Sequence, residues 1–234
     1  MLVTATVVGT LAYLTANTRV VNTFTIGQVE ITLDEGEVKE DGITVDTATR
    51  VTEQTYNYLL VPGVERTKDP RVTVLADSES AYVRVFITIH NASAVKAIVN
   101  NSVHGLGGDY KKLFGVNVGG TVTYGQFGDG WTLYGTPVED TTANTLTLEI
   151  RHGKTTKNAN DYALKEVFTN IKLPATITGT EMKALNGDMT TTEDDFKITI
   201  VAHAIQAEGF NDDENAAWAA FEEQVERENA TTNP

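Results

Sequence analysis

Apolar and polar residues alternate along much of the chain, most clearly in residues 81–90, 145–151 and 196–202. Successive side chains of a β-strand point to opposite faces, so a period of two predicts a strand with one buried face. The residues predicted to face inward are Val83, Val85, Ile87 and Ile89, then Leu146, Leu148 and Ile150, then Phe196, Ile198, Ile200 and Ala202.

Further strands are predicted at residues 24–33, 56–61, 71–75, 121–127, 131–134 and 167–173. Threonine, valine and isoleucine are abundant, and these residues favour strands over helices. Turn-forming pairs separate the segments: Asp41-Gly42, Pro62-Gly63, Gly119-Gly120, Asp129-Gly130 and Asn186-Gly187. Short strands broken by such turns predict an all-β fold, a jelly-roll-like antiparallel β-sandwich.

Two helices are predicted. Residues 92–100 carry apolar residues at helical spacing, in a stretch short enough to form a loop instead. Residues 211–226 are the stronger candidate, because Asp212 and Asp213 can cap the start while Trp218, Phe221 and Val225 fall on one face. We therefore expect one sandwich domain over residues 24–227 that ends in a short helix, preceded by a separate segment, 1–23, and followed by a flexible tail, 228–234.

Composition narrows the classes of partner. The chain has 234 residues, long enough to bury one core, and its 32 acidic and 18 basic residues give a net charge of -14. An acidic surface repels phosphate backbones, so nucleic acid is not an expected partner. Cysteine is absent, which excludes disulfides, thiolate metal sites and thiol nucleophiles.

The first residues have two incompatible interpretations. As a strand, they place Val3, Ala5, Val7, Leu11 and Tyr13 on one apolar face, which predicts a strand that can pair with a sheet edge, including that of a second copy. As an export signal, they place Thr10 and Ala12 before a cleavage site between Ala12 and Tyr13, but no basic residue precedes Arg19. The apolar stretch is too short to span a membrane stably.

Several blocks of sequence resemble the TasA and camelysin family. They are residues 9–15, 22–27 and 29–33, then Val61-Pro62-Gly63, Thr67-Lys68-Asp69-Pro70 and residues 81–85, and finally residues 198–200 and 204–207 with Gly209-Phe210. Residues 101–161 match nothing in that family. The resemblance implies an exported jelly-roll subunit, processed by the signal peptidase SipW between Ala12 and Tyr13, with an architecture similar to archaeal bundling pilins.

Assembly follows from the same resemblance. It implies a secreted or cell-surface homopolymer, a biofilm-matrix or pilus-like fibre in which each copy passes its N-terminal strand to the next. An accessory fibre subunit or the cell envelope would be further partners. Residues 1–12 are then either a retained donor strand or an uncleaved signal, and the sequence leaves both open.

Two alternative functions belong to other classes. Camelysin is described as a metallopeptidase, but His90, His104, His152 and His203 lack the spacing of a zinc motif and are predicted to lie on the surface. The acidic residues of 34–37 lack calcium-loop spacing and are predicted to form a solvated loop. We therefore predict no catalytic residue, no metal and no cofactor.

The second alternative is a monomeric adhesin. Such a protein would bind glycans through exposed aromatic residues of the middle region, since exposed aromatic side chains concentrate at binding surfaces. The candidates are Tyr110, Phe114, Tyr124, Phe127, Trp131 and Tyr134, about half of which we expect in the core.

Overall fold

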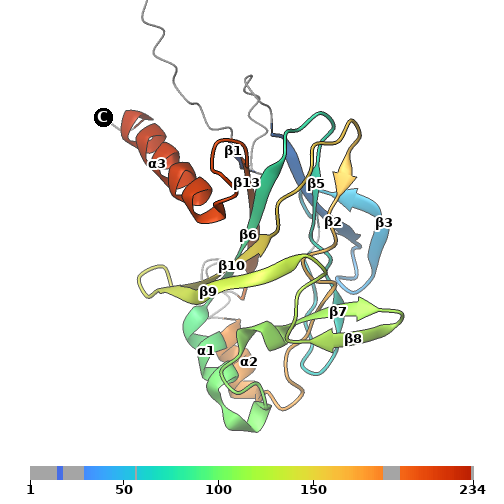
Figure 1. The fold of residues 1–234 in the computed structure, drawn as a ribbon. Helices are drawn as coiled ribbons and strands as arrows, with labels where there is room; N and C mark the ends of the chain where they lie inside the picture. Colours follow the sequence, from blue (N-terminus) through green and yellow to red (C-terminus); the bar gives the residue numbers. More distant parts are fainter. Residues whose placement is uncertain (1–14, 18–28, 56, 187–195, 233–234) are drawn as a thin grey trace, which may run out of the picture.

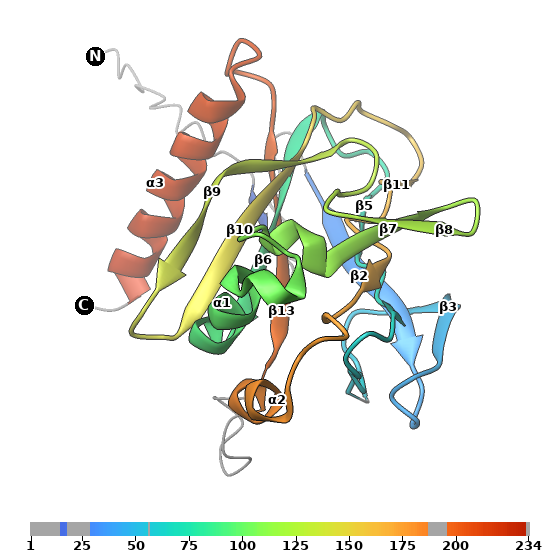
Figure 2. The same cartoon turned by 90° about the horizontal axis from the view of Figure 1, so that it is seen from below.

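The computed structural model describes residues 15–17, 29–55, 57–186 and 196–232. This part of the chain forms three antiparallel sheets with helices at their margins (Figures 1 and 2). None of the helices found in it is long and apolar enough to cross a membrane.

The largest sheet has the strand order β1-β13-β6-β10-β9. Its centre is β6 (Ala81–His90), which pairs with β13 (Ile198–Gln206) on one side and β10 (Thr145–His152) on the other. The edges are β9 (Trp131–Asp140) and the short β1 (Thr15–Asn17). The alternation in β6 follows from its position, because Val83, Val85, Ile87 and Ile89 are fully buried.

The second sheet has the order β11-β5-β2-β3 and faces the first across the core. Its strands are β11 (Tyr162–Ala163), β5 (Arg71–Val74), β2 (Ile31–Val38) and β3 (Val45–Val51). Ile31, Val72 and Val74 from this sheet share one buried cluster with the inward residues of β6 and β10. The predicted antiparallel β-sandwich is therefore confirmed.

A third sheet packs against the same core, with the order β4-β12-β7-β8. It combines β4 (Arg66–Thr67) and β12 (Asn170–Ile171) with the hairpin of β7 (Phe114–Val118) and β8 (Thr121–Tyr124). Phe114 is fully buried, and its ring contacts that of Phe168 at 4.7 Å between centroids. Much of the region that matched no family block thus builds part of the core.

The helices occupy two places. The predicted helix at residues 92–100 is confirmed as α1 (Ala92–Asn100); with η1 (Ser102–His104), η2 (Tyr110–Leu113) and α2 (Gly179–Leu185) it lies at one end of the sandwich (Figure 1). α3 (Glu214–Thr232) lies beside the large sheet (Figure 2). Asp213 caps it, since its carboxylate accepts from the Ala216 N–H at 3.0 Å.

The structure corrects several boundaries. α3 continues to Thr232, well past the predicted end at Glu226, so most of the predicted tail is helical. Residues 57–61 form no strand, β12 is much shorter than predicted, and in place of the strand predicted at 24–33 the described strand is β2, from Ile31. β3, β7 and α2 were not predicted: β3 and α2 carry few apolar residues at a regular spacing, and β7 alternates over only five residues.

Candidate functional site

The predicted donor strand and cleavage site lie outside the described residues. These are Val3, Ala5, Val7, Leu11, Ala12 and Tyr13. The chain is described from Thr15, where β1 pairs with β13 in an antiparallel register: Thr15 with Ile205, Ala16 with Ala204, and Asn17 with His203. The segment that follows the predicted donor therefore forms an edge strand of the large sheet.

A groove lies between β13 and β2. It has a volume of about 110 Å³, and its apolar lining comes from Leu33, Val51, Pro70, Ile198 and Ile200. Ile198 and Ile200 face inward, as predicted, but remain only partly buried. The inward face of β13 is thus incompletely covered at its N-terminal half.

Charged groups of the acidic segment 34–37 border this groove, and they form a paired network. Asp34 accepts from Arg50 Nε at 2.7 Å, and Glu35 forms an ion pair with the buried Lys68. Arg50 also binds the buried carboxylate of Asp69. The prediction of a solvated loop is therefore wrong: these residues belong to β2, and their carboxylates neutralise basic residues at the core margin.

α3 covers one end of the outer face of the large sheet. The contact between them is centred on the buried side chain of Arg84. The Arg84 guanidinium carbon lies 4.2 Å from the ring centroid of Trp218 and 4.9 Å from that of Phe221. Glu222 and Glu149 pair with its charge. The Arg84 side chain is only 4 % exposed, so the aromatic rings and the carboxylates together replace its hydration.

His203 belongs to the same contact, and the prediction of a surface histidine is wrong for it. Its ring stacks on Phe221 at 4.8 Å and meets the edge of Phe86 at 5.4 Å. Burial, with a smaller effect of the nearby Arg84 charge, lowers the pKa of His203 to about 4. His203 does lie on the outer face of β13, but the alternation along the strand does not reveal that a helix covers that face.

His104 is also buried, contrary to the prediction. Its Nδ1 lies 2.7 Å from Thr176 Oγ1, and its Nε2 lies 2.9 Å from a Glu181 carboxylate oxygen. Hydrogen bonds, chiefly from the Thr178 backbone and then from His104, lower the pKa of Glu181 to about 2. Glu181 also completes the capping box of α2 with Thr178, so this relay joins η1 to the start of α2.

The other two histidines lie nearer the surface. His90 bonds Thr199 Oγ1 at 3.0 Å on the outer face, and His152 ends β10. Within the described ranges, no group of three or more histidine, aspartate or glutamate side chains is arranged to hold a metal ion.

The candidate aromatic residues of the middle region differ in exposure. Phe114 and Trp131 are buried, and Tyr134, at 44 % exposed, stacks on Arg151.

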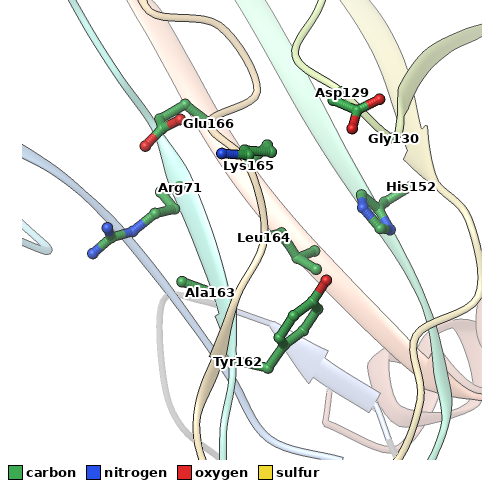
Figure 3. A pocket seen from close by; sticks show the side chains of 9 residues that line it. All are labelled: Arg71, Asp129, Gly130, His152, Tyr162, Ala163, Leu164, Lys165 and Glu166. Atoms are coloured by element: carbon green, nitrogen blue, oxygen red, sulfur yellow. The ribbon is translucent and has the colours of Figure 1, made fainter.

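A larger pocket lies where β11 approaches the end of β10, with a volume of about 600 Å³ (Figure 3). Figure 3 shows Asp129 and His152 on one side and Tyr162, Lys165 and Glu166 on the other. No sequence motif marks this site, because its residues come from separate turns and strand ends. Only the Asp129-Gly130 turn was recognised in advance.

Backbone bonds hold the walls of this pocket in place. Gly128 N–H donates to the Val167 carbonyl at 2.9 Å, and Trp131 Nε1 donates to the Lys165 carbonyl at 2.7 Å. A Cβ at Gly128 would lie 2.0 Å from the Glu166 carbonyl oxygen, so only glycine permits this approach. The pocket is therefore formed by close backbone packing before any ligand arrives.

Comparisons of this chain with protein-family models, with curated proteins and with solved structures find no match.

Proposed function

We propose that this chain is the subunit of an extracellular protein filament whose copies are joined by donated N-terminal strands. The observation that carries the proposal is the register of β1 on β13. If that register continued, Leu14 would oppose Gln206, the last residue of β13, and residues 1–13 would extend past the end of their own sheet. An extended arm of that length reaches about 40 Å.

The composition of the arm supports a protein partner. No charged side chain precedes Arg19, and Val3, Ala5, Val7, Leu11 and Tyr13 would share one face of a strand. An extended backbone needs hydrogen-bond partners, and an apolar face needs a surface that excludes water. The edge of a sheet in a second copy of the chain supplies both through β-strand addition.

The groove between β13 and β2 is the acceptor that best fits such an arm. Its apolar residues include the partly buried Ile198 and Ile200 together with Leu33, whereas the larger pocket is lined by charged side chains. Covering these side chains would contribute several kcal/mol at about 25 cal/mol per Å² of apolar surface. If the arm leaves its own sheet as that register implies, donor and acceptor are different surfaces, and repeated donation builds an open filament.

The resemblance to the TasA and camelysin family agrees with this role. It adds secretion, a location at the cell surface or in a biofilm matrix, and a structural rather than a catalytic function. On this proposal the chain needs no cofactor, and its main partner is another copy of itself.

Negative-stain electron microscopy of two purified forms, residues 1–234 and residues 13–234, tests the proposal at equal concentration. Filaments formed only by the full chain would assign donation to Val3–Leu11. Filaments formed only by the shorter form would identify residues 1–12 as an uncleaved signal and start the donor at Tyr13. If neither form assembles, strand donation is contradicted and a monomeric surface protein becomes the better hypothesis.

A further inference from the structure

The pocket between β11 and the end of β10 has no part in strand donation, and its side chains are arranged for a ligand of another kind. Tyr162 stands on the edge strand β11 and is 45 % exposed. Leu164, which is 3 % exposed, lies near it in the lining (Figure 3). The ring of Tyr162 therefore offers an apolar face at the side of a polar cavity.

Charged residues of both signs line the pocket. Lys165 carries a positive charge, and Asp129 and Glu166 carry negative ones. Arg71 also lines the pocket, but its guanidinium points away from the other side chains (Figure 3) and pairs with Asp34 at 3.6 Å. No ion pair or hydrogen bond involving the side chains of Asp129, Lys165 or Glu166 is found within residues 29–55, 57–186 and 196–232. Their hydrogen-bonding capacity is thus available to a ligand, and they offer charges of both signs.

His152 adds a directed polar atom. Its Nδ1 lies 2.8 Å from the Gly153 carbonyl oxygen, which can only accept, so Nδ1 carries a proton. In the neutral ring, Nε2 is then an acceptor. The ring is held by the edge of Trp131 at 5.0 Å and by the close approach of Gly130, where a Cβ would lie 2.5 Å from Nε2.

We infer that this pocket binds a neutral saccharide. Sugar hydroxyls both donate and accept, so they match a lining that mixes carboxylates, cations and an imidazole acceptor. The apolar face of a sugar ring suits the exposed face of Tyr162. An anionic ligand would meet Asp129 and Glu166, and a cationic one would meet Lys165, so neither finds a lining of the opposite charge alone.

The size and rigidity of the site agree with that class of ligand. A volume of about 600 Å³ lies within the usual range for small-molecule sites, about 300–1,000 Å³, and accommodates a disaccharide. The bonds that tie Gly128 to Val167 and Trp131 to Lys165 fix the walls. A preformed site loses little free energy to ordering when a ligand binds.

Saturation-transfer difference NMR on the full chain tests this inference, because it detects ligand protons whether the protein is monomeric or assembled. The probes are cellobiose, maltose and N,N′-diacetylchitobiose, with inorganic phosphate tested as a competitor. We expect at least one disaccharide to receive saturation at its ring protons, with no displacement by phosphate. Tyr162→Ala should weaken its binding by about tenfold or more through loss of the stacking face.

Two further variants make the result specific. Asp129→Asn keeps the shape of the lining while removing one charge, and it should also weaken binding. Tyr134→Ala removes a comparably exposed tyrosine that stacks on Arg151 outside the pocket, and it should leave binding unchanged. The inference would be overturned if none of the three sugars receives saturation, or if phosphate displaces the bound sugar. It would also be overturned if Tyr134→Ala and Tyr162→Ala lose the same amount of sugar binding.

Discussion

At the residue scale, protonation of His203 couples the contact between α3 and the large sheet to pH. The imidazole lies between Phe221 and Phe86, close to the Arg84 charge, and these surroundings lower its pKa from 6.5 to about 4. Between those values the unfolded chain binds a proton that the folded chain does not. The stability of the fold must therefore decrease as the pH falls through this window.

The pKa of His203 predicts a specific pH dependence. Over the whole window, its protonation should reduce the free energy of unfolding by about 3 kcal/mol. His203→Phe keeps the ring contact and removes the titration, so it should lose less stability on acidification than the original chain. Urea denaturation at about pH 7 and about pH 4.5 measures the difference. The same loss in both proteins would contradict the assignment, and His152→Gln serves as a histidine variant outside this contact.

Glycines show at the same scale why the pocket was not predicted. Gly128 sits where a Cβ would lie 2.0 Å from the Glu166 carbonyl oxygen, yet it belongs to no recognisable turn pair in the sequence. Asp129-Gly130, in contrast, was predicted as a turn, and Gly130 has a φ of 84°. A turn pair in the sequence reveals a glycine that a turn requires. It does not reveal a glycine that is required because a distant segment of backbone passes close to it.

At the scale of elements, α3 is attached to the sandwich through a cluster of its own. Ala217, Trp218 and Phe221 are buried against Tyr82 and Ile205, and this cluster is separate from the main core. The two are connected by strands β6 and β13, whose outer faces carry the small cluster and whose inner faces carry the large one. Loss of the small cluster should therefore release the helix while the sheets stay intact.

Trp218→Ala tests this separation. It removes the ring that covers Arg84, and we expect the free energy of unfolding of α3 to fall by about 3 kcal/mol or more. Hydrogen exchange should accelerate along α3 and remain slow in the centre of β6 and β10. Val225→Ala, a smaller change on the same helix face, is the control and should have a weaker effect. Equal loss of protection in β6 would show that α3 and the sandwich unfold together.

The elements also differ in how completely the sequence predicts their position and their buried face. β6, β10 and β13 were predicted with their inward residues, because each has one face in a continuous core and therefore a strict alternation. β4, β11 and β12 have two residues each, which is too few to establish a period. The capping box of α2, Thr178 with Glu181, was present in the sequence and could have revealed that helix.

At the scale of the whole molecule, the two open surfaces separate the proposed functions. The apolar groove lies between β13 and β2, whereas the charged pocket lies between β11 and β10. Neither could be predicted from the sequence, since each brings together residues of different sheets and turns that are separated along the chain. The two share no lining residue, although Arg71 of the pocket pairs with Asp34 of the groove at 3.6 Å, so a strand bound in the groove would lie near the saccharide pocket.

Strand donation predicts that a copy without its donor stops growth. The form comprising residues 13–234, added in substoichiometric amount to assembling full-length protein, should accept an arm in its groove and offer none in return. The mean filament length in electron micrographs should then fall as more of it is added. Ile198→Asp in the shorter form places a charge in the groove, so this variant, if circular dichroism shows it folded, should leave the length unchanged. If both forms shorten filaments equally, the acceptor lies elsewhere; if neither does, residues 1–12 do not join the subunits.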